Sequence, residues 1–143
     1  MPDQVEGWSP AIPWAKSAAC LKALDKVEDA LAAEEQVLAF ELQATNLDRA
    51  AIVIARIADL LITLNRIPEA LASSIRSVEL AEQSGDRRAL ALANEWHGDK
   101  LQKQSQHEEA LEFYRKAIEA GSLPDQVEGW SPQVRGQSLQ NAS

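Results

Sequence analysis

The sequence predicts an all-α protein in which three antiparallel helix hairpins stack into a solenoid. The first observation behind this prediction is composition. Ala, Leu, Glu and Gln are abundant among the 143 residues, whereas only 6 Gly, 6 Pro and 1 Tyr occur, and the abundant side chains lose little rotamer freedom on a helical backbone. The second is that apolar residues recur at spacings of three and four, as in amphipathic helices. The third is a repeat of forty residues, a length typical of stacked helical units.

The repeat is visible when the chain is compared with itself at an offset of forty residues. The pair Ala30–Leu31 recurs as Ala70–Leu71 and as Ala110–Leu111, and an acidic residue precedes it each time. A second equivalent position holds only small residues, namely Ala18, Ala58 and Gly98. Small residues on both helices of a unit let those helices approach closely. Because one hairpin cannot bury its apolar face alone, we expect three hairpins to share a continuous core.

Six helices are expected near residues 12–24, 27–44, 48–64, 68–84, 87–104 and 107–120. The pair Ser9-Pro10 offers an N-cap for the first helix, followed by proline at the first helical position. Pro68 falls in the first turn of the fourth helix, where its missing N–H costs little. Gly85 stops that helix and Asp86 caps the fifth, while Gly121 stops the sixth.

The expected helices divide the chain into an N-terminal extension at 1–10, three units at about 11–47, 48–86 and 87–123, and a tail at 124–143. The tail is polar after Pro132, and a short capping helix is one option for it. The nonamer PDQVEGWSP occurs at residues 2–10 and again, without a difference, at residues 124–132.

Three explanations of the repeated nonamer stay open. One is a longer array with a period of 122 residues, the separation of the two copies. Another is an end segment that was engineered or recently duplicated. In the third, both copies fit the same acceptor surface, one within the molecule and one on a neighbour. That explanation predicts head-to-tail self-association, carried by the apolar residues Val5, Trp8, Val127 and Trp130.

Charge and cysteine content argue against several functions. A net charge of −8 leaves no surplus of Lys and Arg to neutralise phosphates, so nucleic acid is not an expected partner. The longest apolar stretch, 50–64, is interrupted by Arg56 and Asp59 and is too short to span a bilayer, so no membrane insertion is expected. The single cysteine, Cys20, fits a reducing compartment, and a cytoplasmic location is expected. In its Ala-rich helix, Cys20 is expected to be buried and inert.

No group of residues predicts catalysis, a metal site or a cofactor. A packing or partly exposed role is expected for both histidines, His97 and His107, since no serine or cysteine lies at a motif spacing from them. Asp99 follows His97 by two residues, but a metal needs three or four convergent ligands. Isolated helix-stop glycines do not form a phosphate loop. The acidic side chains are expected on outer, solvated faces.

A recognisable spacing in the third unit is formed by Gly98, Leu101, Ala110, Tyr114 and Ala117. With this spacing, and with Trp14 in the first unit, the chain resembles the tetratricopeptide (TPR) repeat family over about residues 11–121, in a variant with repeats of about 40 residues. Two units depart from the family's aromatic residue and second alanine, with Glu34, Val37, Ser74 and Ser77 at those positions. The resemblance implies a right-handed solenoid whose first helices line a concave groove that holds an extended peptide or a helix.

The repeat register then gives the groove-facing positions. The first unit is expected to contribute Ala15, Lys16, Ala19 and Lys22. The predicted peptide-binding residues of the other units are Ile52, Ala55, Arg56, Asp59, Ile62, Leu92, Trp96, Asp99 and Lys103. The helix near 48–64 is apolar nearly all round, which fits a central helix packed on both sides. It also fits an apolar groove floor, edged by Trp96, that accepts a partner's hydrophobic side chains.

The function expected from the resemblance is a protein-interaction scaffold, with a peptide or amphipathic helix of another protein as its partner. The alternatives are a self-assembling head-to-tail repeat unit and a dedicated peptide-binding chaperone or sensor. Chaperone-binding members of the family clamp a C-terminal carboxylate with several cations and asparagines. Here the corresponding positions hold Ala15, Ala19, Arg56, Leu92 and Trp96. One arginine cannot form a multi-point clamp, so capture of a chaperone tail is not expected.

Overall fold

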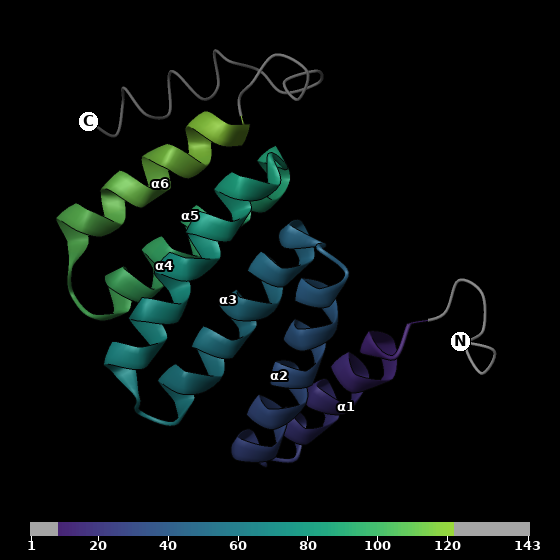
Figure 1. Cartoon of the computed structure of the whole chain (residues 1–143). Helices are drawn as coiled ribbons and strands as arrows, with labels where there is room; N and C mark the ends of the chain where they lie inside the picture. The colour runs from purple at the N-terminus through teal and green to yellow at the C-terminus, as the bar shows by residue number, and fades with distance from the viewer. Residues whose placement is uncertain (1–8, 122–143) are drawn as a thin grey trace.

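The computed structural model describes residues 9–121, and these residues fold into six α-helices without a strand (Figure 1). The helices are α1 (Ala11–Ala23), α2 (Val27–Gln43), α3 (Leu47–Thr63), α4 (Ile67–Ser84), α5 (Arg87–Lys103) and α6 (His107–Gly121). Each helix begins and ends within one residue of its predicted span. The all-α prediction is therefore confirmed.

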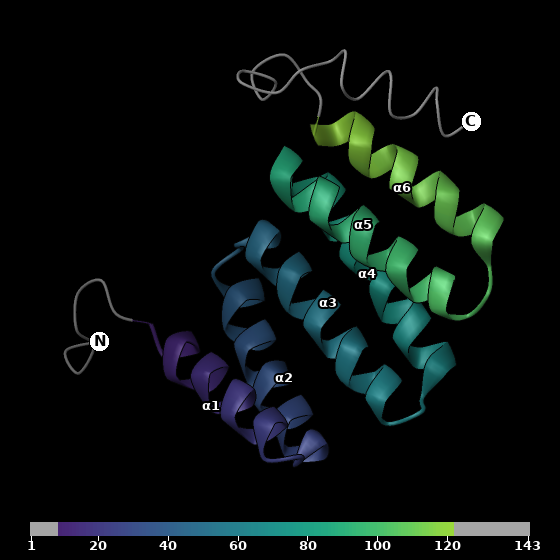
Figure 2. The same cartoon turned by 180° about the vertical axis from the view of Figure 1, so that it is seen from behind.

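Helices adjacent in the chain pair as hairpins. Contacts are most extensive between α3 and α4, between α5 and α6, and between α1 and α2. The hairpins stack in chain order, because α2 also contacts α3, α4 contacts α5, and α3 contacts α5. As a result, α1 and α6 lie at opposite ends of the stack (Figures 1 and 2). The option of a capping helix after residue 123 lies outside the described residues.

Small residues set the close approach of the two helices in each hairpin, as predicted. Ala30, Ala70 and Ala110 occupy equivalent places, and each is 0% exposed. In the third hairpin, Gly98 lies against the ring of Tyr114, where an added Cβ would be 2.8 Å from a ring carbon. Carbon atoms pack at roughly 3.5–4.0 Å. Even an alanine at residue 98 would therefore force the tyrosine ring to move.

The turns within the hairpins share a backbone conformation that the sequence analysis did not predict. Asp25, Asn65 and Ser105, again forty residues apart, adopt left-handed φ angles of 66°, 62° and 62°. The next residue of each turn donates its N–H to the carbonyl five positions back, at 2.8–2.9 Å. This bond closes the C-terminus of the helix as a Schellman motif. Thr45, with φ 56°, ends α2 in the same way. Gly85 is the left-handed residue at the end of α4, with φ 73°.

The caps at the helix starts follow the prediction with one shift. Asp86 accepts a backbone N–H in the first turn of α5 at 3.0 Å, and Pro68 lies in the first turn of α4. Ser9 accepts the N–H of Ala11 at 3.1 Å. The helix begins at Ala11, so Pro10 precedes the first helical residue instead of occupying that position.

The core consists of two layers, one between the first and second hairpins and one between the second and third. From α3, Val53, Ile57 and Leu60 enter the first layer, and Ile54 enters the second. The helix is therefore packed on both sides, which confirms the interpretation of its nearly continuous apolar sequence as a central helix. The polar or half-buried residues that α3 keeps at the surface include Arg49, Ile52, Arg56 and Asp59.

Candidate functional site

An open groove lies between α1 and α3, with α2 contributing its floor. It consists of two adjacent cavities of about 500 and 480 Å³, which share Ala15 and Arg56. We call the first the Arg49 cavity, the second the Lys22 cavity, and the two together the α1–α3 groove. The Arg49 cavity is lined by Ser9, Ala11, Ile12, Ala15, Val37, Glu41, Arg49, Ile52, Val53 and Arg56. The Lys22 cavity is lined by Ala15, Lys16, Ala18, Ala19, Lys22, Glu34, Arg56, Asp59 and Leu60.

Much of the surface of this groove is apolar. Ile12 of α1 is 47% exposed, and Ile52 faces the same cavity from α3. Along the Lys22 cavity, α1 presents three alanines together with the side chains of Lys16 and Lys22. The alanines of α1 leave space in the groove, and isoleucines line it from both α1 and α3. Apolar groups of a ligand that bind there would be removed from water.

Arg56 lies where the two cavities meet, and an ion pair fixes its position. Its Nε and Nη2 donate to the two carboxylate oxygens of Glu34 at 2.8 and 2.9 Å. The Glu34 side chain is 8% exposed, while that of Arg56 is 41% exposed. Glu34 thus contradicts the expectation that acidic side chains lie on solvated outer faces, because a bidentate partner compensates its burial. Arg56 remains accessible to a ligand, but its direction is set by α2.

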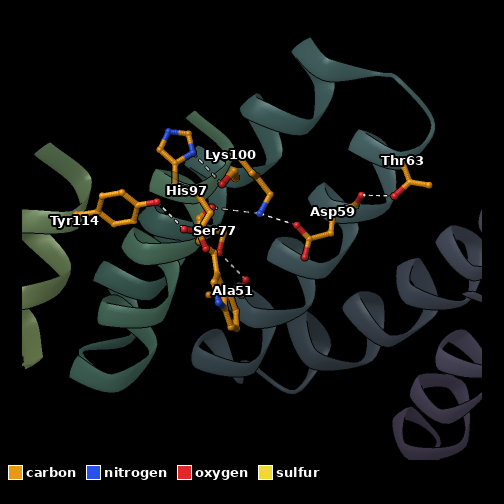
Figure 3. Close-up of polar contacts among 10 residues, drawn as sticks. Ala51, Asp59, Thr63, Ser77, His97, Lys100 and Tyr114 are labelled. Carbon is orange, nitrogen blue, oxygen red and sulfur yellow. Dashed lines mark hydrogen bonds and ion pairs between the residues drawn. The ribbon is translucent and has the colours of Figure 1, made fainter. Parts of the chain in front are cut away.

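Asp59 is engaged in a second ion pair, which joins α3 to α5. The Lys100 Nζ lies 2.9 Å from the Asp59 Oδ1, and Figure 3 shows the lysine reaching from its helix to that carboxylate. The Lys100 side chain is 4% exposed, whereas that of Asp59 is 56% exposed. A buried ammonium needs its counter-ion. Asp59 therefore serves the packing of the second hairpin against the third, in addition to lining the groove.

Three cations of the groove lack such partners. Lys16, Lys22 and Arg49 are exposed, and none of them forms an ion pair with another of residues 9–121. Glu41, the remaining acid of the Arg49 cavity, accepts a hydrogen bond from Asn46 at 2.9 Å. Glu34 and Asp59 are already paired, and Glu41 alone opposes the three cations, so the uncompensated charge along the groove is positive. This contrasts with the net charge of −8 of the whole chain.

The predicted binding residues of the second unit differ in whether they line the groove. Ile52, Arg56 and Asp59 line the groove. Ala55 is 1% exposed, so its assignment as a groove residue is wrong. The physical reason is that α3 is packed on both sides and a methyl group does not extend beyond the surrounding side chains. Ile62 is half-buried and packs against the layer between the first two hairpins.

The predicted residues of the third unit lie outside both cavities. Leu92 and Trp96 are half-buried, while Asp99 and Lys103 are exposed. Asp99 accepts a hydrogen bond from the Tyr114 hydroxyl at 2.6 Å, and this bond raises the pKa of Tyr114 to about 12 (Figure 3). Both cavities of the groove therefore lie at the first two hairpins.

His97 is packed inside the molecule, whereas His107 is exposed. The His97 Nδ1 lies 2.9 Å from the Ser74 hydroxyl, and its ring meets that of Phe113 edge-on, with centroids 4.4 Å apart. Burial, with added repulsion from Lys100 and Lys116, lowers the pKa of His97 to about 4. The imidazole is thus neutral near pH 7 and links α4 to α5.

The expectation that Cys20 is buried is wrong, because its side chain is exposed. The residues at equivalent positions of the other units, Leu60 and Lys100, are buried. Both lie on helices that pack against the hairpin before them. Within the described chain no hairpin precedes α1, so the same helix face meets solvent there.

Residues 1–8 and 122–143 lie outside the described part, and with them the four predicted self-association residues, Val5, Trp8, Val127 and Trp130. Within residues 9–121, no three His, Cys, Asp or Glu side chains converge on a metal-binding geometry. None of the six helices there has the length and hydropathy needed to cross a membrane. No protein-family model and no curated protein matches the chain. Residues 9–121 thus form a stack of helical hairpins that carries an open, cation-edged groove.

Proposed function

We propose that this chain is a TPR-like protein-interaction scaffold that binds a partner peptide in the α1–α3 groove. The observation that carries the proposal is the composition of the groove. Two adjacent cavities combine isoleucine surface with three unpaired cations on a frame of helices. Such a surface suits a segment with apolar side chains for the floor and acidic side chains for the edges.

The frame supports this function because its polar anchor is already fixed. Arg56 is oriented by Glu34 before any ligand arrives, so little conformational entropy is lost when it donates to a peptide. Recognition of this kind needs no catalytic group, and the proposal includes none. A dedicated peptide-binding chaperone or sensor would use the same groove, and only the identity of the peptide would distinguish it from a general scaffold.

The test is selection of peptides from a random displayed library with the full-length protein, followed by titration of the selected peptides. We expect Ile12→Ser and Arg49→Glu each to weaken binding about tenfold or more, since they remove an apolar contact and reverse a groove charge. Two matched controls lie on α4 and outside both cavities. They are Ile75→Ser, whose isoleucine is 37% exposed, and Arg76→Glu.

The controls should bind the selected peptides as the parent protein does. Far-ultraviolet circular dichroism would verify that all four variants keep their helix content. Equal affinity of the groove variants and the parent protein would contradict the proposal and place the binding surface elsewhere.

A further inference from the structure

The repeated nonamer carries acidic and apolar side chains that complement the cations and the apolar surface of the groove. Its second copy, residues 124–132, carries Asp125 and Glu128 and no cation. It also carries Val127 and Trp130, each two residues after one of the acids. Acidic and apolar side chains thus occur together in one short segment, which matches the cations and isoleucines of the α1–α3 groove. The complementarity of charge is the first argument for a specific ligand.

The first copy of the nonamer ends at the groove. Its last two residues, Ser9 and Pro10, line a cavity of about 420 Å³ beside the groove, and Arg49 lines this cavity as well. Ser9 also lines the Arg49 cavity itself, and its hydroxyl accepts the N–H of Ala11 at the start of α1. The last residues of the first copy of PDQVEGWSP therefore lie beside Arg49, one of the exposed cations of the groove. Its second copy has the same residues in the same order.

The two copies belong to opposite ends of the stack. The groove lies at the end formed by α1, whereas the second copy begins three residues after Gly121, where α6 ends (Figures 1 and 2). A segment that leaves one molecule at the α6 end is therefore placed to meet a second molecule at its α1 end. Repetition of this contact is heterologous and joins copies head to tail.

We propose that residues 124–132 of one copy bind the α1–α3 groove of a second copy of this chain. The inference rests on the proposed function of the groove and names its occupant. Asp125 and Glu128 meet the groove cations, and Val127 and Trp130 cover its apolar surface. The first copy of the nonamer is tethered next to the same groove. It competes with the incoming segment at a high effective concentration.

The test is sedimentation velocity of the full-length protein over a wide range of concentrations. We expect the average mass to rise with concentration, and to fall again when salt is raised from about 0.05 to about 0.5 M, because the ionic contacts are screened. Trp130→Ala should weaken association about tenfold or more, since an aromatic anchor is lost. Trp8→Ala should strengthen it, because the tethered competitor is weakened.

A charge swap locates the contact on the groove. Copies of the double variant Lys16→Glu, Arg49→Glu should associate poorly with one another, whereas Arg76→Glu should self-associate as the parent does. Adding Asp125→Arg and Glu128→Arg to the double variant itself should restore self-association, because the segment and the groove of that one chain are complementary in charge once more. Recovery of that kind cannot result from misfolding of either partner.

Several results would overturn the inference. The first is that the parent protein and Trp8→Ala both stay monomeric at every concentration. The second is that Trp130→Ala or the double variant associates as strongly as the parent protein. Failure here is distinguishable from failure of the proposed function. If library peptides bind the groove while the protein stays monomeric, the groove has another ligand. If neither peptides nor association depend on groove residues, both proposals fail.

Discussion

Glu34 and Ser74 occupy equivalent positions on α2 and α4, forty residues apart, where the TPR pattern has an aromatic residue. Glu34 pairs with Arg56, and Ser74 lies 2.9 Å from the Nδ1 of His97, so each contacts the first helix of the next hairpin. Both Glu34 and Ser74 are buried. Removing one partner of a buried polar pair leaves the other without compensation. These pairs therefore favour one arrangement of neighbouring hairpins over others.

The buried His97 makes stability depend on pH. Its pKa is about 4 in the folded protein and 6.5 in a model peptide, so between these values the unfolded chain binds the proton more readily. The stabilisation is complete above pH 6.5 and is lost as the pH falls toward 4. We expect the free energy of unfolding to fall by about 2 kcal/mol between pH 7.5 and pH 5 from this group. Urea unfolding at the two pH values measures this loss.

Two variants separate the effect of His97 from that of other groups. His97→Leu should remove the loss, whereas His107→Ala, at the exposed histidine, should retain it. An equal loss in His97→Leu and in the parent protein would show that other groups cause the dependence.

At the scale of the helices, the left-handed turn residues are the least favourable backbone positions. Thr45 is β-branched, yet its φ is 56°. Left-handed backbone costs most residues roughly 1–2 kcal/mol, and glycine avoids this cost. We therefore expect Thr45→Gly to stabilise the protein by about 1 kcal/mol. Thr63→Gly, at the end of α3, should instead be neutral or destabilising by a few tenths of a kcal/mol, because Thr63 is helical. Thermal unfolding of both variants tests the difference in sign.

The helices could be predicted closely, but their turns could not. Apolar spacing and caps such as Asp86 report directly on where a helix begins and ends. The turn conformation was missed because its three residues, Asp25, Asn65 and Ser105, differ in type and none is glycine. The available signal was their shared offset of forty residues, combined with the tolerance of Asp and Asn for left-handed backbone.

The groove could be predicted from the sequence only in part. The repeat register predicted a groove-facing position for Ile52, Arg56 and Asp59, and these three residues line the two cavities. It could not show that Arg56 and Asp59 are held by Glu34 and Lys100, since a register gives faces and not side-chain directions. Arg49, at the start of the same helix, was missed because the register was applied only from residue 52 onward.

At the scale of the whole molecule, charge is distributed unevenly along the stack. The chain carries a net charge of −8, while the unpaired cations Lys16, Lys22 and Arg49 gather on the groove at the α1 end. A surface that is acidic elsewhere repels anionic segments, and a local positive edge attracts them. The field of the molecule thus adds to the contacts of the groove in favouring acidic ligands, and this part of the preference should weaken with salt.

The main contacts join helices that are neighbours in the chain, with α3 and α5 as the additional pair. In such a stack, structure grows from one unit to the next, and partial opening starts where a helix has one neighbour rather than two. We expect amide hydrogen exchange to be slowest in α3, and faster by about tenfold or more in α1 and α6. Uniform exchange would instead indicate a single cooperative unit. Since α1 forms one wall of the groove, that wall can open while α3 stays folded. A bound ligand should therefore slow amide exchange in α1 more than in any other helix.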